Sequence, residues 1–300
     1  MLQRKALIAG GTGFIGSKLS KALIENGYKL TILTRKNLIT NSANLSYINN
    51  LDEAEFDYDI VINLCGETIS CRWSDKKKKE IYDSRILTTR ALAQKILDRK
   101  VPPSLFISGS AIGYYGTSST KVFQEKSLPT NQKLFSQKVC FDWEKKAMVV
   151  EEKTRLVFLR TGVVIGKNGG IIKKMFLPFY LGLGGKIASG KQDISWIHID
   201  DEVGAILHII KNPELKGPVN LTSPNHTSNL QFSKSLAKAL RRPCLFAIPG
   251  LSMKLAYGKM ADELLLNGQK VYPKVLIESG YKFKFSDLSS ALEEVFPKSK

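Results

Sequence analysis

The sequence lacks the features that mark membrane, disulfide-bonded and metal-dependent proteins. No apolar run approaches the roughly 18 to 20 residues of a transmembrane helix. The 4 cysteines are scattered without a Cys-x-x-Cys pair, which argues against a zinc site and a disulfide framework. The 3 histidines are too far apart to share a helix face as metal ligands. Because the N-terminal segment also lacks an apolar signal sequence, we expect a soluble, cytoplasmic protein with no bound metal and no membrane partner.

A net charge of +18, from 45 Lys and Arg against 27 Asp and Glu, raises the question of nucleic-acid binding. The densest basic run, residues 76–79, opens a predicted helix, and four consecutive residues point to all sides of a helix. The other basic residues are dispersed and are not interleaved with aromatic side chains that could stack on bases. The sequence therefore predicts a solvated basic surface and no nucleic-acid partner.

Short apolar strands alternate with amphipathic helices along most of the chain. This alternation is typical of a doubly wound α/β fold, in which helices cover both faces of a parallel sheet. The predicted strands are 5–9, 28–34, 59–64, 104–108, 155–160, 196–199 and 218–222, and the predicted helices are 14–26, 74–100, 132–152 and 200–210.

A glycine-rich turn connects the first predicted strand to the first predicted helix. In such a turn the first glycine permits a tight bend, the second lets the backbone approach a pyrophosphate, and the third lets helix and strand pack closely. The helix N-terminus adds about half a positive charge and unpaired N–H groups. The turn therefore predicts a dinucleotide site, formed by Gly10, Thr12, Gly13, Phe14, Ile15 and Gly16.

The end of the second predicted strand indicates which dinucleotide is bound. An acidic residue at this point would accept hydrogen bonds from the ribose of NAD, whereas a basic residue accommodates the 2′-phosphate of NADP. The segment reads Thr34-Arg35-Lys36, and no Asp or Glu occurs between Gly27 and Leu51. We therefore predict NADP(H) as the cofactor, with these three residues at its phosphate.

Glycines interrupt the regular alternation after Gly162. We expect residues 166–190 and 213–230 to form a smaller substrate-side lobe, inserted into an NADP-binding domain that covers residues 1–245. Residues 246–300 have a helical pattern and many lysines, and we predict that they form a small C-terminal domain.

Several segments together resemble the extended short-chain dehydrogenase/reductases, which have a Rossmann fold. Beside the glycine turn, these are Asn63-Leu64-Cys65-Gly66, Ser108-Gly109-Ser110-Ala111 and Ser195-Trp196-Ile197-His198-Ile199-Asp200-Asp201. Further segments look like the atypical branch called the epimerase family proteins, notably Asp83-Ser84-Arg85, Gly113-Tyr114-Tyr115-Gly116 and Met260-Ala261-Asp262-Glu263-Leu264-Leu265. The resemblance adds Leu64, Cys65, Gly66 and Ser108 to the cofactor site, and it implies a C-terminal domain of unknown function.

The catalytic pair of this superfamily is absent from the sequence. Active members carry a Tyr and, four residues later, a Lys that lowers the pKa of the Tyr. None of the 10 tyrosines is followed by a Lys at that spacing, and Phe135 and Val139 stand at the two positions. Three residues could still support hydride chemistry. Ser110 aligns with the catalytic Ser of the superfamily, and Tyr114 or Tyr115 could replace the missing acid, with packing or substrate stacking as their alternative roles.

Arg72, Trp73 and Arg160 follow strand ends, where open α/β sheets bind ligands. Basic groups beside an aromatic ring suit an anionic or planar substrate, and a structural role is the alternative for each. The sequence thus predicts an NADP(H)-dependent oxidoreductase or epimerase-like enzyme for a small polar molecule that it does not identify. The alternative is a non-catalytic NADP(H)-binding sensor or regulator, since some relatives are labelled as cell-division inhibitors. The oligomeric state stays open, with a homodimer as one candidate.

Overall fold

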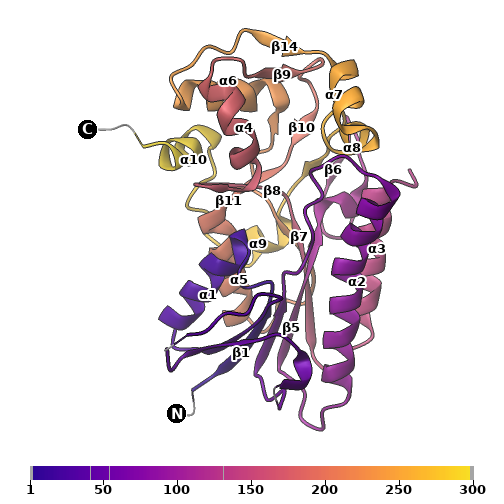
Figure 1. Ribbon diagram of the computed structural model, residues 1–300, viewed down its shortest axis with the longest axis vertical. Coiled ribbons are helices and arrows are strands. Elements are labelled where there is room, and N and C mark those ends of the chain that lie inside the picture. Colours follow the sequence, from indigo (N-terminus) through magenta and orange to yellow (C-terminus); the bar gives the residue numbers. More distant parts are fainter. Residues whose placement is uncertain (1–2, 41, 54, 131, 298–300) are drawn as a thin grey trace.

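The computed structural model describes residues 3–40, 42–53, 55–130 and 132–297. Within these residues the main element is a sheet of 7 strands in the order β12-β7-β5-β4-β1-β2-β3, all parallel (Figure 1). The strands are β1 (Lys5–Ala9), β2 (Lys29–Leu33), β3 (Leu45–Ile48), β4 (Ile60–Asn63), β5 (Leu105–Ala111), β7 (Arg155–Thr161) and β12 (Gly217–Leu221). The predicted doubly wound α/β fold is confirmed, and the strand order reverses between β1 and β4.

Helices cover both faces of this sheet. They are α1 (Phe14–Glu25), α2 (Asp75–Leu97), α3 (Phe135–Met148) and α5 (Ile199–Lys211). On β1, Ala6 and Ile8 belong to the core beneath α1 and α5, whereas Leu7 and Ala9 belong to the core beneath α2 and α3. Because successive side chains of a strand point to opposite faces, a continuously apolar strand can serve both layers.

The smaller lobe lies above the sheet in Figure 1. It contains β8 (Val163–Gly166), α4 (Gly170–Tyr180), β9 (Gly185–Ile187), β10 (Asp193–Ile194), β11 (Trp196–His198), β13 (Thr227–Ser228) and α6 (Asn229–Ala239). Its core is separate from the two cores of the sheet and includes Ile172, Trp196 and Phe232. The lobe therefore has an apolar interior of its own.

Strand β3 and helix α6 are among the elements of the structure that were not predicted from the sequence. Strand β3 lies at the sheet edge and reads Leu-Ser-Tyr-Ile, so only Ile48 is fully buried. Helix α6 buries Phe232 and Leu236 but also the polar Asn229 and Ser233, which weakens its apolar stripe. The predicted helices 74–100 and 132–152 are shorter in the structure, at 75–97 and 135–148. None of the described helices has the length and apolar character needed to cross a lipid bilayer.

The C-terminal segment crosses from one lobe to the other. It contains β14 (Phe246–Ile248), α7 (Gly250–Tyr257), α8 (Lys259–Leu264), β15 (Lys270–Val271), α9 (Lys274–Glu278) and α10 (Leu288–Val295). Strand β14 pairs with β9 of the smaller lobe, while β15 pairs with β6 (Val122–Phe123). Leu276 of α9 is buried in a core of the main sheet, and Leu292 of α10 is buried in the core of the smaller lobe. The segment therefore completes both lobes.

Replacement of Leu276 tests how strongly this segment stabilises the sheet. Leu276→Ala should lower the free energy of unfolding by about 2 to 5 kcal/mol, because it leaves a cavity against the sheet. The neighbouring Ile277→Ala is the matched control, since Ile277 is 36% exposed. Urea unfolding followed by far-ultraviolet circular dichroism measures both variants. A main unfolding transition that Leu276→Ala leaves unchanged would contradict this interpretation.

Candidate functional site

The strand register brings the predicted cofactor segments together at the carboxyl edge of the sheet. Ala9 lies opposite Leu33 of β2 and Asn63 of β4, so the residues that follow these three strands meet at one edge. The backbone N–H of Gly10 donates to the carbonyl of Leu33 at 3.4 Å. Asn63 in turn lies opposite Ser108 on β5. Ligands of open α/β sheets bind at this edge, where the strand order reverses.

The glycine turn fits tightly against the neighbouring backbone. Gly10 has a φ of +85°, and a Cβ at this position would lie 2.8 Å from the carbonyl carbon of Leu64. A Cβ on Gly16 would lie 2.2 Å from the carbonyl oxygen of Gly10. A Cβ on Gly13 would meet only that same oxygen, at 3.3 Å, so the space beside Gly13 is otherwise open. The turn therefore packs against backbone at Gly10 and Gly16, and it leaves free space for a ligand at Gly13.

The first turn of α1 offers free hydrogen-bond donors. The N–H of Ser17 donates to the carbonyl of Gly13 at 2.9 Å, which is the first hydrogen bond of the helix. The N–H groups of the residues just before Ser17 therefore have no partner within the helix. Gly13 caps the helix without a side-chain hydrogen bond, and the first turn contains no acidic residue. Such an N-terminus attracts a phosphate through its N–H groups and the helix dipole.

The basic segment after β2 lies beside this turn. Arg35 and Lys36 are exposed, and their side chains form no hydrogen bond or ion pair with any described residue. Asn49 holds their backbone, because its Nδ2 donates to the carbonyls of Thr34 at 2.8 Å and Lys36 at 3.2 Å. Burial raises the pKa of the Cys65 thiol to about 11, against the opposing charge of Arg35. The Cys65 thiol is therefore protonated at neutral pH. Because Arg35 influences Cys65, which follows β4, the Arg35 side chain lies near the end of that strand.

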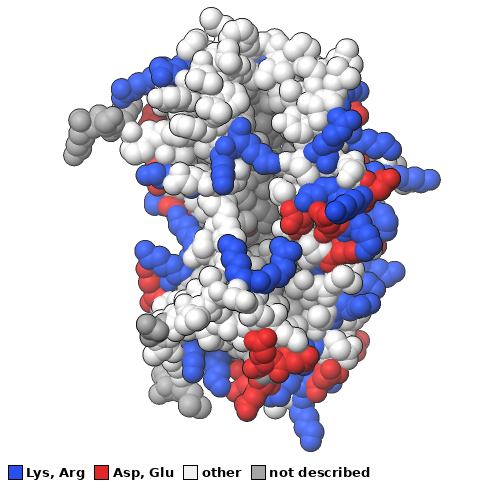
Figure 2. Space-filling model, viewed as in Figure 1, with Lys and Arg blue, Asp and Glu red and all other residues white. Residues whose placement is uncertain are grey.

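Basic side chains are spread over the face of the molecule that Figure 2 shows, with acidic side chains among them. The surface is hollowed between the two lobes, and Lys and Arg side chains lie on both rims of the hollow. The absence of a nucleic-acid partner stays a prediction.

Ser110 belongs to a buried polar network rather than to an open site. Its Oγ donates to Oε1 of Glu144 at 2.7 Å. Arg160 donates to the same carboxylate from Nε and Nη2, both at 2.9 Å, and from Nη1 to the Tyr115 oxygen at 3.0 Å. The Tyr115 hydroxyl donates to Asn220 at 2.7 Å, and burial raises the pKa of Tyr115 to about 12. This network argues against the predicted roles of Tyr115 as a proton donor and Arg160 as a substrate ligand.

Tyr114 differs from its neighbour in the same loop, η2 (Ile112–Tyr115). Its ring centroid lies 3.5 Å from the guanidinium carbon of Arg160, and the ring of Phe141 meets it edge-on at 4.7 Å. The side chain is half-buried, and no described residue forms a hydrogen bond with its hydroxyl. Tyr114 is thus the one predicted catalytic tyrosine in the described chain with an uncommitted hydroxyl.

The predicted substrate residues Arg72 and Trp73 both form contacts within the protein. Nη1 of Arg72 donates to the carbonyls of Leu255 at 2.5 Å and Ala256 at 3.3 Å, near the end of α7. Trp73 is buried, and its Nε1 donates to the carbonyl of Ile69 at 2.8 Å. Its ring packs edge-on against Phe135 at 5.0 Å. The burial of Trp73 argues against contact with a substrate, whereas the role of the exposed Arg72 stays a prediction.

The position of the missing catalytic tyrosine is closed by the C-terminal segment. Glu263 of α8 caps α3, because its carboxylate accepts from the N–H of Phe135 at 3.1 Å and from the N–H of Ser136 at 2.9 Å. It also accepts from the Ser136 hydroxyl at 2.7 Å. Sequence reasoning noted the segment that contains Glu263 but did not assign this role. Lys138, on the same helix as Phe135, is exposed and pairs with Asp142.

The glycine cradle at the point of strand reversal defines a dinucleotide-binding protein of the Rossmann type. Residues 6–222 match the NAD dependent epimerase/dehydratase family, and residues 248–295 match a domain of unknown function, DUF1731. The chain belongs to the NAD dependent epimerase/dehydratase family. The resemblance to epimerase family proteins is thereby confirmed.

Relatives cover nearly the whole chain. Epimerase family protein SSP1921 of Staphylococcus saprophyticus is 40% identical over 296 residues, which is 96% of this chain and 98% of the relative. Epimerase family protein YfhF of Bacillus subtilis is 36% identical over 295 residues, which is 96% of this chain and 96% of the relative. The crystal structure of human epimerase family protein SDR39U1 with NADPH has a TM-score of 0.88 and 34% identity, with 97% and 98% of the chains covered. A UDP-glucuronic acid 4-epimerase from Bacillus cereus, at 18% identity and a TM-score of 0.78, shares the fold.

A buried carboxyl group that sequence reasoning missed lies between α5 and the end of β7. Oε1 of Glu202 accepts from the Thr161 hydroxyl at 2.8 Å, while Oε2 has no hydrogen-bond partner among the described residues. Burial raises the pKa of Glu202 to about 8. The side chain is therefore protonated in the folded protein at neutral pH, whereas it ionises near pH 4.3 in the unfolded chain.

This difference predicts a pH-dependent loss of stability. The folded state binds the extra proton between about pH 4.3 and pH 8, so the contribution of Glu202 to stability falls as the pH rises through this window. Relative to the wild type, Glu202→Gln should gain free energy of unfolding on the order of a few kcal/mol between pH 5 and pH 8. Urea unfolding at both pH values measures the gain. The exposed Glu293→Gln is the control, and an equal offset at both pH values for Glu202→Gln would refute the prediction.

Proposed function

We propose that this chain binds NADP(H) at the carboxyl edge of the sheet and exchanges a hydride between this cofactor and a small polar substrate. The main observation in support is the shape of the glycine turn. A Cβ would lie within 2.8 Å of backbone atoms at Gly10 and at Gly16, but not at Gly13. A pyrophosphate fits the open space at Gly13, next to the free N–H groups of α1. The donor set of the site therefore suits a dinucleotide.

The choice of NADP(H) over NAD(H) depends on Arg35. Its guanidinium has no partner in the described chain, and a planar guanidinium suits bidentate contact with a phosphate. Lys36 adds a second free charge, and Asn49 fixes the turn that carries both residues. The human relative SDR39U1, solved with NADPH, supports this assignment.

NADP(H) supplies hydride exchange at its nicotinamide ring, so the chain itself must bind the substrate and supply or remove a proton. We assign the proton to the Tyr114 hydroxyl, which has no hydrogen-bond partner among described residues. The guanidinium of Arg160 lies 3.5 Å from the Tyr114 ring centroid and holds the ring by a cation–π contact. Glu144 holds Arg160 in place through two hydrogen bonds of 2.9 Å. The substrate would enter by the hollow between the lobes (Figure 2).

A second candidate function is NADP(H) binding without catalysis. It is favoured by the buried network of Ser110, Glu144 and Arg160, which commits the Ser110 hydroxyl to Glu144. It is also favoured by Phe135, which cannot exchange a proton and is packed against Trp73. In this case cofactor binding would regulate a partner or report the redox state of the NADP pool.

Replacement of Arg35 tests the cofactor assignment. The wild type should bind NADPH in preference to NADH, and Arg35→Glu should lose at least about tenfold in NADPH affinity, because a charge-assisted contact to phosphate is replaced by repulsion. NADH affinity should change little. Fluorescence titration of the nucleotide measures both constants. Lys29→Glu, at the opposite end of β2, is the control of equal charge change. A preference for NADPH that survives Arg35→Glu would rule out this role.

Replacement of Tyr114 separates the two candidate functions. If Tyr114 transfers the proton, Tyr114→Phe should lower kcat about a hundredfold or more with unchanged NADPH affinity, because only the hydroxyl is removed. NADPH oxidation on a panel of small carbonyl compounds measures kcat, and Tyr47→Phe on β3 is the control. Full activity of Tyr114→Phe would exclude the assigned role. A wild type that binds NADPH but oxidises it with no compound of the panel would favour the non-catalytic function.

A further inference from the structure

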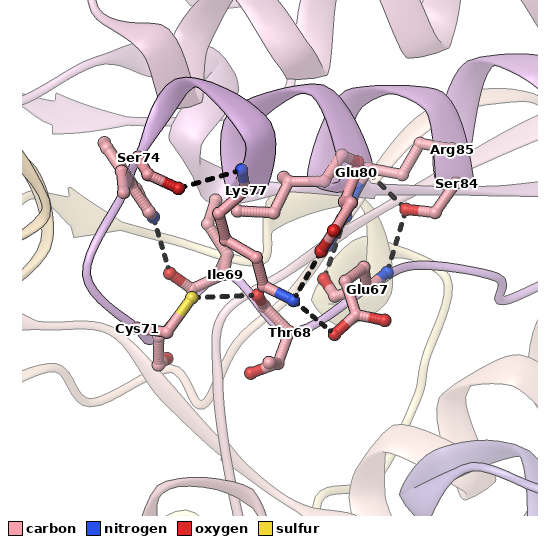
Figure 3. Close-up of polar contacts among 12 residues, drawn as sticks. Glu67, Thr68, Ile69, Cys71, Ser74, Lys77, Glu80, Ser84 and Arg85 are labelled. Carbon is pink, nitrogen blue, oxygen red and sulfur yellow. Dashed lines mark hydrogen bonds and ion pairs between the residues drawn. The ribbon is translucent and has the colours of Figure 1, made fainter.

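Arg85 of α2 lies at the end of β4 and was not assigned a role by the sequence. Its Nη1 donates to the carbonyls of Glu67 and Ile81, both at 3.0 Å. Figure 3 shows Arg85, Ser84 and Lys77 reaching from α2 to the segment around Glu67. Ser84 accepts from the Glu67 N–H at 2.9 Å, and Lys77 pairs with the Glu67 carboxylate at 3.0 Å. One edge of the Arg85 guanidinium thus helps to hold this loop.

The other edge of the guanidinium is uncommitted. Nε and Nη2 of Arg85 donate to no described residue. Unlike the Nε of Arg99, they are also not sealed from solvent. The ring of Trp143 covers one side, with its centroid 5.2 Å from the guanidinium carbon. Two parallel N–H groups are therefore available in the fork geometry that matches a carboxylate.

Gly66 keeps this edge accessible. A Cβ on Gly66 would lie 2.9 Å from both the guanidinium carbon and Nη2 of Arg85. Gly66 is exposed and follows β4 by three residues, at the carboxyl edge where Gly10 and Leu64 meet. The Arg85 guanidinium thus lies beside the predicted cofactor site. It occupies the space into which the side chain of any residue other than glycine at position 66 would project.

No carboxylate neutralises Arg85 within the described chain. The carboxylate of Glu67 is engaged by Lys77 at 3.0 Å, and that of Glu144 is engaged by Arg160 at 2.9 Å. Burial lowers the pKa of Arg85, the opposite direction to the ion-paired Arg160. Arg85 is half-buried, and a cation that is partly removed from water without a counter-charge is costly, so such groups concentrate at functional sites.

We propose that Arg85 binds a carboxylate of the substrate through Nε and Nη2, so that the substrate class is a small carbonyl compound with a carboxylate group. This inference rests on the proposed function, because it places the substrate beside the bound cofactor. It moves the anion-binding role to Arg85 from Arg160, whose guanidinium is engaged by Glu144 and Tyr115, and from Arg72, which is exposed and holds the end of α7 through Nη1. Trp143 and the carbonyls of Glu67 and Ile81 hold the guanidinium in position for the carboxylate.

The experiment compares an acid with its uncharged ester on the NADPH complex of the full chain. Calorimetric titration measures the dissociation constants of 2-oxobutyrate and methyl 2-oxobutyrate. The wild type should bind the acid at least about tenfold more tightly, and Arg85→Gln should remove this preference while ester binding stays the same. Arg90→Gln is the matched control, since Arg90 is exposed on the same helix. Equal binding of acid and ester by the wild type, or an acid preference that survives Arg85→Gln, would overturn the proposal.

A second variant covers the case in which Arg85→Gln disturbs the loop that Nη1 holds. Arg85→Lys keeps the charge but not the fork, and it should weaken acid binding about tenfold with no effect on ester binding. Unchanged acid binding in Arg85→Lys would contradict the proposal. NADPH affinity should be the same in all three variants, and a tenfold loss in the Arg85 variants alone would mean that Arg85 binds a cofactor phosphate. A wild type that binds the acid but never oxidises NADPH would leave the carboxylate site standing and remove the hydride-transfer function.

Discussion

The contact between Gly16 and the carbonyl oxygen of Gly10 positions much of this molecule. A Cβ on Gly16 would lie 2.2 Å from that oxygen, so α1 can begin this close to β1 only because residue 16 is glycine. The same helix start places the ring of Phe14, which would lie 2.1 Å from a Cβ on Gly169 in the smaller lobe. Lys18, one turn later, pairs with Asp200 of α5. The start of α1 therefore contacts the glycine turn, helix α5 and the smaller lobe.

Three arginines near the carboxyl edge have different roles because they meet different partners. Arg160 is neutralised by Glu144, and a buried pair of this kind costs several kcal/mol to break. Arg72 reaches the carbonyls of Leu255 and Ala256, which satisfies groups near the end of a helix. Arg85 meets carbonyls on one edge only. The three guanidinium groups therefore differ in counter-charge and burial, since Arg160 is buried against a carboxylate, Arg85 is half-buried without one, and Arg72 is exposed.

The features that could be predicted from the sequence are those encoded locally. Apolar strands, helix periodicity and the glycine turn depend on neighbouring residues, and the structure confirms the parallel sheet and the helices on both its faces. Strand β3 was missed because only one of its four residues is fully buried. Arg72 and Trp73 carried the right chemistry for a ligand, but their partners could not be read from spacing. Leu255 accepts from Arg72 across 183 positions of the chain, and no local pattern reports such a contact.

The cap that Glu263 places on α3 has a consequence for how the chain is made. Glu263 follows Phe135 and Ser136 by 128 and 127 positions in the chain. The N–H groups of these two residues therefore lack this partner until Glu263 has been synthesised. Strand β6 likewise has no pairing partner until β15 is synthesised, and the core of the main sheet lacks the side chain of Leu276 until that residue is synthesised. A growing chain can form the first strands and α1 as they emerge, but the start of α3 is capped only after residue 263 has been synthesised. Shorter intermediates of the growing chain would therefore leave the start of α3 uncapped and strand β6 unpaired.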